Sequence, residues 1–272
     1  MKTLFITNNP DIALHAELSG VGAILIDMEV AGKAERQGHL DTHKAAHSLA
    51  DVETIAPLLT TAELMVRINP PSPDTAREVR DAASAGAGRI MLPMFRTVEQ
   101  VAAFKRAAGK TPVTLLVETA TALARLPAIL KLLDGDDHVH FGLNDLCLDM
   151  NLSFLFEIMA GRMLDTPAML CKQAGRPFGI GGVGRVGQGH VPAEWILGEH
   201  VRLGSRAVIL SRVFHENATN LCELTDRIDL PREITALQRV RRTWADLSDI
   251  DLEDNHKRLA ECVSKLVRER AA

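Results

Sequence analysis

Short apolar runs alternate along the chain with longer amphipathic stretches, at a spacing of roughly 20 to 35 residues. This alternation is typical of repeated strand–helix units, in which the parallel strands are buried on both faces. The apolar runs predict eight strands, at residues 3–7, 23–29, 63–69, 89–94, 113–119, 138–143, 177–181 and 207–211. Helices are predicted between them, including 10–18, 42–59, 73–85, 98–108 and 123–133.

Polar and small residues mark the ends of several of these helices. Asp41 or Thr42, Ser72 before Pro73, and Thr97 stand at positions that favour a helix start. Glycines at positions 20, 86, 109 and 135 follow predicted helix ends. Eight strands, each followed by a helix, predict a (β/α)₈ TIM barrel of the α/β class, because an open Rossmann sheet would need fewer strands and a nucleotide fingerprint.

The pattern changes near the carboxyl terminus, where a charged and helical stretch contains no further strand. We predict a catalytic barrel domain at 1–228 and a C-terminal helical extension at 229–272, with helices at about 231–247 and 252–269. Leu237, Val240, Trp244 and Leu247 recur at helical spacing and form an apolar stripe. The stripe is expected to pack either on the barrel or on a neighbouring subunit.

Composition and charge narrow the class of partner. The net charge is −4 with mixed signs and no sustained basic stripe, so neither nucleic acid nor a membrane surface is an expected partner, and a small molecule is favoured. The first residues contain too few apolar side chains for a signal peptide or a membrane span, which favours a cytoplasmic protein. Cys147, Cys171, Cys222 and Cys262 form no CxxC pair, so reduced thiols are expected.

Charged residues close four of the apolar runs. The runs read ILIDME (24–29), LMVRIN (64–69), TLLVET (114–119) and HFGLND (140–145), and they end in Asp27 and Glu29, Arg67, Glu118, and Asp145. A charge at the carboxyl end of a buried strand is costly unless it is used. Because these ends meet at one mouth of a barrel, the pattern predicts an active site there.

Side-chain alternation directs one of these carboxylates toward the barrel axis. Thr114, Leu116 and Glu118 share one face of their strand, and a carboxylate turned toward the helix layer would be hard to satisfy. Glu118 and Asp145 end neighbouring strands, five and six, so their carboxylates are expected to lie close together. Two oxygen ligands with open positions for water and substrate describe a Mg²⁺ or Mn²⁺ site.

Arg67 ends strand three at the same mouth. As a fixed cation it is suited to bind a substrate carboxylate or to stabilise an enolate oxygen. The alternative is a structural ion-pair cluster of Arg67 with Asp27 or Glu29.

The set of motifs IDME, VRIN, MLPM, LVET and FGLNDL resembles the HpcH/HpaI aldolase and citrate lyase β-subunit family, within the phosphoenolpyruvate/pyruvate-type barrels. The order, strand positions and intervening lengths agree from about Leu4 to Ser211. The resemblance implies a divalent metal held by Glu118 and Asp145, and an arginine, Arg67, that contacts a 2-oxo acid. It also implies carbon–carbon bond cleavage or formation through a metal-bound enolate, and a homo-oligomer, a trimer or hexamer.

Two positions depart from the family pattern. Val30 stands where bacterial aldolases of the family commonly carry an acid/base histidine, and Leu116 stands where they carry glutamine. The catalytic base is therefore assigned to His43, in the loop VAGKAERQGHLDTH, or to a metal-bound water. In the same loop, Lys33 and Arg36 are candidates for recognising an anionic group of the substrate.

Further substrate-binding candidates are Asp27 and Glu29 on strand two, and Gly142 and Asn144 in the FGLNDL motif. The glycine-rich segment FGIGGVGRVGQGH (178–190) adds Arg185, because glycines allow the backbone to approach a phosphate or carboxylate closely. The alternative for this segment is a simple turn.

These observations predict a divalent-metal-dependent carbon–carbon lyase or aldolase acting on a 2-oxo acid. A Claisen-type condensation or cleavage with an acyl-CoA is the close alternative. A non-catalytic binding or scaffold barrel is the alternative from another class, and proton exchange on pyruvate would discriminate it from an enolising enzyme.

Overall fold

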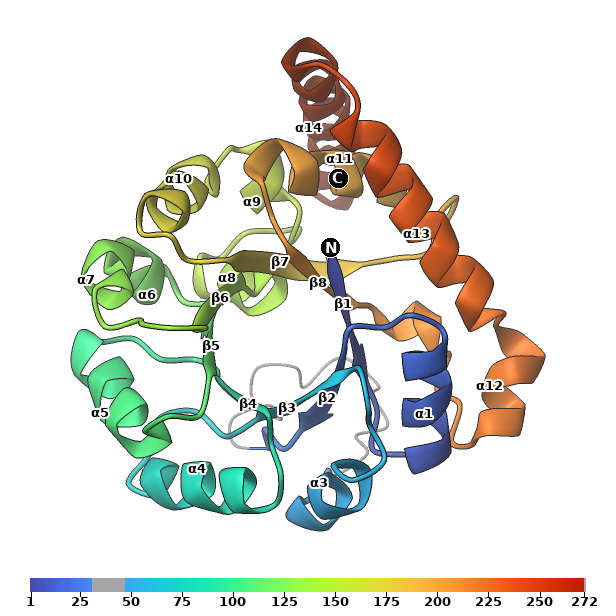
Figure 1. Ribbon diagram of the computed structural model, residues 1–272. Helices are drawn as coiled ribbons and strands as arrows, with labels where there is room; N and C mark the ends of the chain where they lie inside the picture. Colours follow the sequence, from blue (N-terminus) through green and yellow to red (C-terminus); the bar gives the residue numbers. More distant parts are fainter. Residues whose placement is uncertain (31–46, 272) are drawn as a thin grey trace.

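The computed structural model describes residues 1–30 and 47–271. Eight parallel strands close into a barrel in chain order, each hydrogen-bonded to its neighbours, as the view along the barrel in Figure 1 shows. The strands are β1 (Lys2–Ile6), β2 (Ala23–Asp27), β3 (Glu63–Arg67), β4 (Arg89–Leu92), β5 (Val113–Val117), β6 (His138–Phe141), β7 (Phe178–Val183) and β8 (Ala207–Leu210). The predicted TIM barrel is confirmed.

The helices surround the barrel and leave its axis to the strands (Figure 1). They are α1 (Pro10–Leu18), α3 (Leu49–Ile55), α4 (Thr75–Ser84), α5 (Val98–Ala108), α6 (Ala120–Ala124), α7 (Leu126–Leu130), α8 (Leu143–Asp149), α9 (Glu157–Ala160), α10 (Asp165–Gln173), α11 (Ala193–Leu203), α12 (Leu221–Arg227), α13 (Leu230–Ala245) and α14 (Asp249–Ala271), with a 3₁₀ turn at Arg212–Phe214.

The predicted helices 10–18 and 98–108 match α1 and α5 at both ends. The predicted helix 123–133 is instead two short helices that meet at Arg125, because Pro127 stands in the first turn of α7 and cannot continue a helix from before it. Of the predicted helix 42–59, residues 42–46 lie outside the described residues, and α3 begins only at Leu49.

Local signals explain where the helices begin and end. The Asn9 side chain accepts a hydrogen bond from the Ile12 N–H, and Pro10 occupies the first turn of α1. Thr97 and Gln100 form a capping box at α5. Gly109 ends the same helix with a φ of 59°, a conformation that favours glycine.

The core has two parts, one on each side of the sheet. The larger part lies between the strands and the helices, and the smaller lies on the barrel axis. The buried members of the axial cluster are Leu4, Ala23, Leu25, Met65, Met91 and Leu116. Side chains of the same parity at the strand ends therefore also point to the axis, which fixes the orientation of the residues at each mouth.

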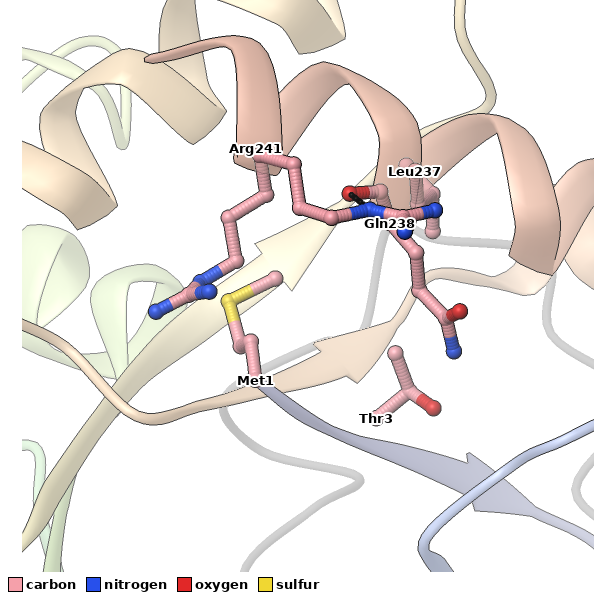
Figure 2. Close-up of a pocket in the computed structure, with 6 residues that line it drawn as sticks. Met1, Thr3, Leu237, Gln238 and Arg241 are labelled. Atoms are coloured by element: carbon pink, nitrogen blue, oxygen red, sulfur yellow. Dashed lines mark hydrogen bonds between the residues drawn. The ribbon is translucent and has the colours of Figure 1, made fainter. Parts of the chain in front are cut away.

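The helix α13 lies against the barrel wall between α11 and α1 (Figure 1). It crosses β1, where Met1 and Thr3 lie beneath Leu237, Gln238 and Arg241 and line a pocket of about 240 Å³ (Figure 2). Helix α13, the first helix of the predicted extension, packs on the barrel of the same chain, and the domain division at residue 228 stays a prediction. The segment that lies beyond the wall is α14.

The helix α14 docks on α11 of the same chain rather than standing free. Asn255 Nδ2 donates a hydrogen bond to the Trp195 carbonyl at 3.0 Å, and His256 Nδ1 lies 3.1 Å from Glu199 Oε2. Close approach requires Gly198, since a Cβ there would lie 2.4 Å from Asn255 Nδ2. Of the predicted tail stripe, Leu237 is buried and Trp244 Nε1 donates to the Glu194 carbonyl at 2.8 Å, whereas Leu247 is exposed. A contact of the extension with a neighbouring subunit stays a prediction. In the described residues, no helix combines the length and apolarity needed to cross a membrane.

Candidate active site

The predicted charged residues gather at the carboxyl-terminal mouth of the barrel. Asp27 and Arg67 are the last residues of β2 and β3 and are register partners, and Glu118 follows the last residue of β5. We predicted that Asp145 ends strand six, but β6 ends at Phe141 and Asp145 lies in the first turn of α8. The strands that lead to the two carboxylates, β5 and β6, are adjacent as predicted.

Glu118 is a buried carboxyl group with only 2% of its surface exposed. Burial raises its pKa, and although Arg67 opposes this, the neighbouring Asp145 and Glu29 carboxylates raise the pKa further, to about 8. The ionised form of Glu118 is therefore unfavourable in this surrounding, and a bound cation would stabilise it.

Two backbone features hold the Glu118 carboxylate in place. The Met94 N–H donates a hydrogen bond to Oε1 at 3.0 Å, from a residue with a φ of 53°. On the other side the carboxylate lies against Gly142, where a Cβ would come within 2.7 Å of Oε2. The φ of Gly142 is −85°, so space for Glu118, and not backbone conformation, requires glycine at this position.

Arg67 is held by the carboxylates at the end of β2. Its Nε and Nη2 donate to the two carboxylate oxygens of Asp27 at 2.8 and 2.7 Å, and Nε lies 3.5 Å from Glu29 Oε2. Burial alone would lower the arginine pKa, but the Asp27 pair, with Glu29 and Glu118, raises it above its usual range. The ion pairs of the structural alternative are therefore present. They fix the orientation of a permanent cation beside Glu118.

The loops that carry these residues are tied by side-chain hydrogen bonds that the sequence analysis did not identify. The Asp27 N–H donates to His47 Nδ1 at 2.9 Å, and the Val30 N–H donates to Asn69 Oδ1 at 3.0 Å. Glu78 accepts hydrogen bonds from both the backbone and the side chain of Asn69. The asparagine of the motif VRIN could have indicated this role, because an amide side chain directly after a buried strand is able to hydrogen-bond to two neighbouring loops.

The two departures from the family pattern differ in their surroundings. Leu116 is 1% exposed and belongs to the axial cluster below Glu118. Val30 is 64% exposed at the mouth. An apolar residue at 116 packs the floor of the site and offers no hydrogen bond there.

The remaining predicted residues are spread over the mouth or lie beyond the described residues. Asn144 is exposed in the first turn of α8. Arg185 pairs with Glu216 at 2.7 Å and donates to Gln188 Oε1 at 3.1 Å, so it joins the loops after β7 and β8. Lys33, Arg36 and His43 lie outside the described residues. Their assigned roles stay predictions.

The donor set at the mouth fits a divalent cation of the magnesium type. In residues 1–30 and 47–271, no group of three or more histidine, cysteine, aspartate or glutamate side chains is arranged to hold a metal ion. Mg²⁺ needs no such group, because it is commonly bound through one or two carboxylates together with substrate oxygens and water. A buried Glu118 whose pKa is raised, near a second carboxylate, meets that requirement.

The protein is a TIM barrel that carries carboxylates and an oriented arginine at its carboxyl-terminal mouth. This is the end of the barrel where TIM-barrel enzymes have their active sites. The family model of HpcH/HpaI aldolase/citrate lyase matches residues 3–157, more than half of the chain. The chain belongs to this family, whose members are lyases. A comparison with curated protein sequences gave no match.

Solved structures confirm the fold. An HpcH/HpaI aldolase from Desulfitobacterium hafniense DCB-2 has a TM-score of 0.59 and 16% identity, over 91% of this chain and 93% of that one. An HpcH/HpaI aldolase/citrate lyase family protein from Burkholderia cenocepacia J2315 has a TM-score of 0.60 and 18% identity, over 89% and 94%. A citrate lyase beta subunit from M. tuberculosis, complexed with oxaloacetate and magnesium, has a TM-score of 0.60 and 18% identity, over 89% and 96%.

Proposed function

We propose that this protein is a divalent-metal-dependent carbon–carbon lyase that acts on a 2-oxo acid through an enolate. The observation that carries the proposal is the buried Glu118 carboxyl group, placed near Asp145 and beside the oriented Arg67 guanidinium. The family membership supports the class of reaction, and the magnesium and oxaloacetate bound to the M. tuberculosis relative support the choice of metal and substrate class.

Glu118 and Asp145 would hold Mg²⁺ or Mn²⁺, which when bound would polarise the keto oxygen of the substrate. Glu118 is suited to this role because the Met94 N–H and the Gly142 backbone fix its carboxylate. Burial keeps bulk water from screening the charge, so the site's electrostatic interactions are stronger than in solution.

Arg67 would stabilise the negative charge that develops on the substrate oxygen when the carbon–carbon bond breaks. Two of its N–H groups are committed to Asp27, and a guanidinium carries five. The donors on the other edge are therefore suited to bind an oxyanion, while Asp27 and Glu29 orient the group. A direct role of Asp27 and Glu29 in substrate binding stays a prediction, as do the roles of Gly142, Asn144 and Arg185.

Proton exchange on pyruvate tests the proposal directly. In D₂O with Mg²⁺ or Mn²⁺, the protein should accelerate loss of the methyl proton signal of pyruvate in the ¹H NMR spectrum, because an enolising site exchanges these protons. Glu118→Gln should abolish the acceleration. Glu53→Gln, which makes the same change at an exposed position of α3, is the matched control.

The outcomes separate the alternatives. Exchange no faster than with the metal alone would favour a scaffold barrel over an enzyme. Exchange that survives in Glu118→Gln would remove Glu118 from the metal site. If exchange occurs, product analysis with pyruvate plus an aldehyde, and with oxaloacetate plus acetyl-CoA, decides between an aldolase and the Claisen-type reaction. Light scattering of the same samples tests the predicted trimer or hexamer.

A further inference from the structure

A cavity in the barrel interior lies near the amino-terminal ends of β7 and β8. On the axis face these strands contribute Gly179 and Ala207, opposite Leu4 of β1 and Met65 of β3. The His140 ring packs against Gly179, where a Cβ would collide with that ring, and the cavity that these residues help to line has a volume of about 260 Å³. It lies at the end of the barrel opposite the proposed metal ligands.

Two buried polar groups line this cavity without a hydrogen-bond partner among the described residues. They are Thr114 Oγ1 and His140 Nε2, and each residue is 2% exposed. Burial, together with the charge of Arg67, lowers the pKa of His140 to about 3, so its ring is neutral. Unsatisfied buried polar groups are costly, and a guest with a hydroxyl or keto oxygen would satisfy them.

Two of the basic residues that line the cavity have acidic partners, and one of them, His138, lies 3.2 Å from Asp136 Oδ1. Lys2 is paired with Glu63 at 2.9 Å, whereas Arg206 is exposed and forms no ion pair with a described residue. None of the described residues that line the cavity is an aspartate or glutamate. The rim is therefore suited to a carboxylate, held by the Arg206 guanidinium.

We propose that this cavity is a second small-molecule site, which binds a short-chain monocarboxylate bearing a hydroxyl or keto group at its far end. The carboxylate binds Arg206, the apolar chain contacts Leu4 and Met65, and the terminal oxygen bonds with Thr114 and His140. The volume sets the size, since a cavity of about 150 Å³ holds benzene and one of 260 Å³ therefore has room for about ten heavy atoms. The molecule 6-hydroxyhexanoate, with nine heavy atoms, is one atom smaller than that.

Titration calorimetry with matched probes tests the proposal. The probe 6-hydroxyhexanoate should bind more tightly than hexanoate, which lacks the hydroxyl, and than 1,6-hexanediol, which lacks the charge. The preference over hexanoate is expected to be about fivefold, the effect of one hydrogen bond, and the preference over the diol about tenfold or more, the effect of one charged hydrogen bond. Four- and eight-carbon ω-hydroxy acids should bind more weakly, because they underfill or overfill the cavity.

Two variants test whether the probe binds in the cavity. Arg206→Gln should weaken binding of both carboxylates about tenfold and leave the diol unchanged, whereas Arg239→Gln, the same change at an exposed position of α13, should alter neither. Thr114→Val should remove most of the preference for the hydroxy acid over hexanoate. It should not lower the unfolding temperature, since the hydroxyl that it deletes has no partner among the described residues.

The active-site variant Glu118→Gln should bind 6-hydroxyhexanoate as the wild type does, which separates this site from the catalytic mouth. The proposal is overturned by the absence of binding at millimolar probe, by binding that both cavity variants leave unchanged, or by binding that Glu118→Gln removes. None of these results depends on enzymatic turnover, so a failure here is distinct from a failure of the proposed function.

Discussion

Replacing Gly142 by alanine tests whether the position of the Glu118 carboxylate controls metal binding. The added Cβ would lie 2.7 Å from Glu118 Oε2, 2.9 Å from Glu118 Cβ and 3.2 Å from Leu116 Cδ1. Comfortable contacts between carbon atoms are about 3.5 to 4.0 Å, so Glu118 must move by roughly 1 Å. Because Gly142 has a φ of −85°, the substitution introduces no backbone strain that would confuse the result.

The consequence for the site follows from the narrow tolerance of metal coordination. Metal–ligand distances are held to within about 0.2 Å, so a displacement of about 1 Å removes Glu118 as a ligand. We expect Gly142→Ala to weaken Mn²⁺ binding at least tenfold and to abolish proton exchange on pyruvate. The stability cost should stay within about 1 to 3 kcal/mol, the range for overpacking one methyl group.

Two further variants make the measurement specific. Gly142 is also the N-cap of α8, where alanine is unfavourable, and Gly142→Ser supplies a capping side chain while keeping the Cβ contact. The serine variant should therefore recover stability without recovering Mn²⁺ binding. Gly184→Ala is the control, since a Cβ there meets nothing within 4 Å. Calorimetric Mn²⁺ binding by Gly142→Ala within twofold of the wild type would refute the reasoning.

Three more predictions concern charge and packing. Arg67→Lys should lower kcat about 100-fold with little change in KM, because the charge that it stabilises develops in the transition state; steady-state kinetics that show a rise in KM alone would assign it to substrate anchoring. Glu17 has its pKa lowered to about 2, since three backbone N–H groups, of Thr60, Thr61 and Ala62, outweigh the effect of burial. Glu17→Gln should thus cost up to about 3 kcal/mol in urea unfolding at pH 7. The difference in unfolding free energy between wild type and variant should shrink only below about pH 4.5, where Glu17 becomes protonated in the unfolded chain but stays charged in the folded protein. An undiminished difference at pH 3.5 would contradict the assignment. Gly198→Ala should lower the unfolding temperature although alanine favours helices by about 1 kcal/mol, and Asn255→Ala in the same chain should relieve the loss; a rise in the single variant would show that α14 is not docked as described.

The sequence was sufficient to predict the barrel and the mouth at which Asp27, Arg67 and Glu118 gather. Strand periodicity gave the number and order of the strands, and side-chain parity placed Glu118 on the axis. Both follow from patterns within a single strand.

What could not be predicted depends on how separate segments meet. The register that sets Asp27 opposite Arg67 belongs to two strands, so the sequence left an ion pair and substrate binding as alternatives. The strand β6 ends at Phe141 and α8 begins at Leu143, so Asp145 lies in a helix and not at the end of a strand as predicted. The N–H of Met94 gave no signal, because a backbone donor is present at almost every residue.

A buried arginine, Arg89, and a half-buried one, Arg67, lie at opposite ends of the barrel and show how the contacts of a residue separate a structural role from a chemical one. Arg89 begins β4 and bonds with Glu63, with the Val113 carbonyl, and with both the backbone and the side chain of Asp136. These bonds engage all three of its nitrogens.

The hydrogen bonds of Arg67 to described residues engage only Nε and Nη2, both on the side of Asp27. Every nitrogen of the Arg89 guanidinium thus has a partner within the fold, as expected where a barrel end serves stability. Arg67 is oriented from one side only, at the mouth where Glu118 lies. A ligand can add to its contacts without displacing any of the hydrogen bonds that hold it, and this is the physical reason to expect chemistry at Arg67 and not at Arg89.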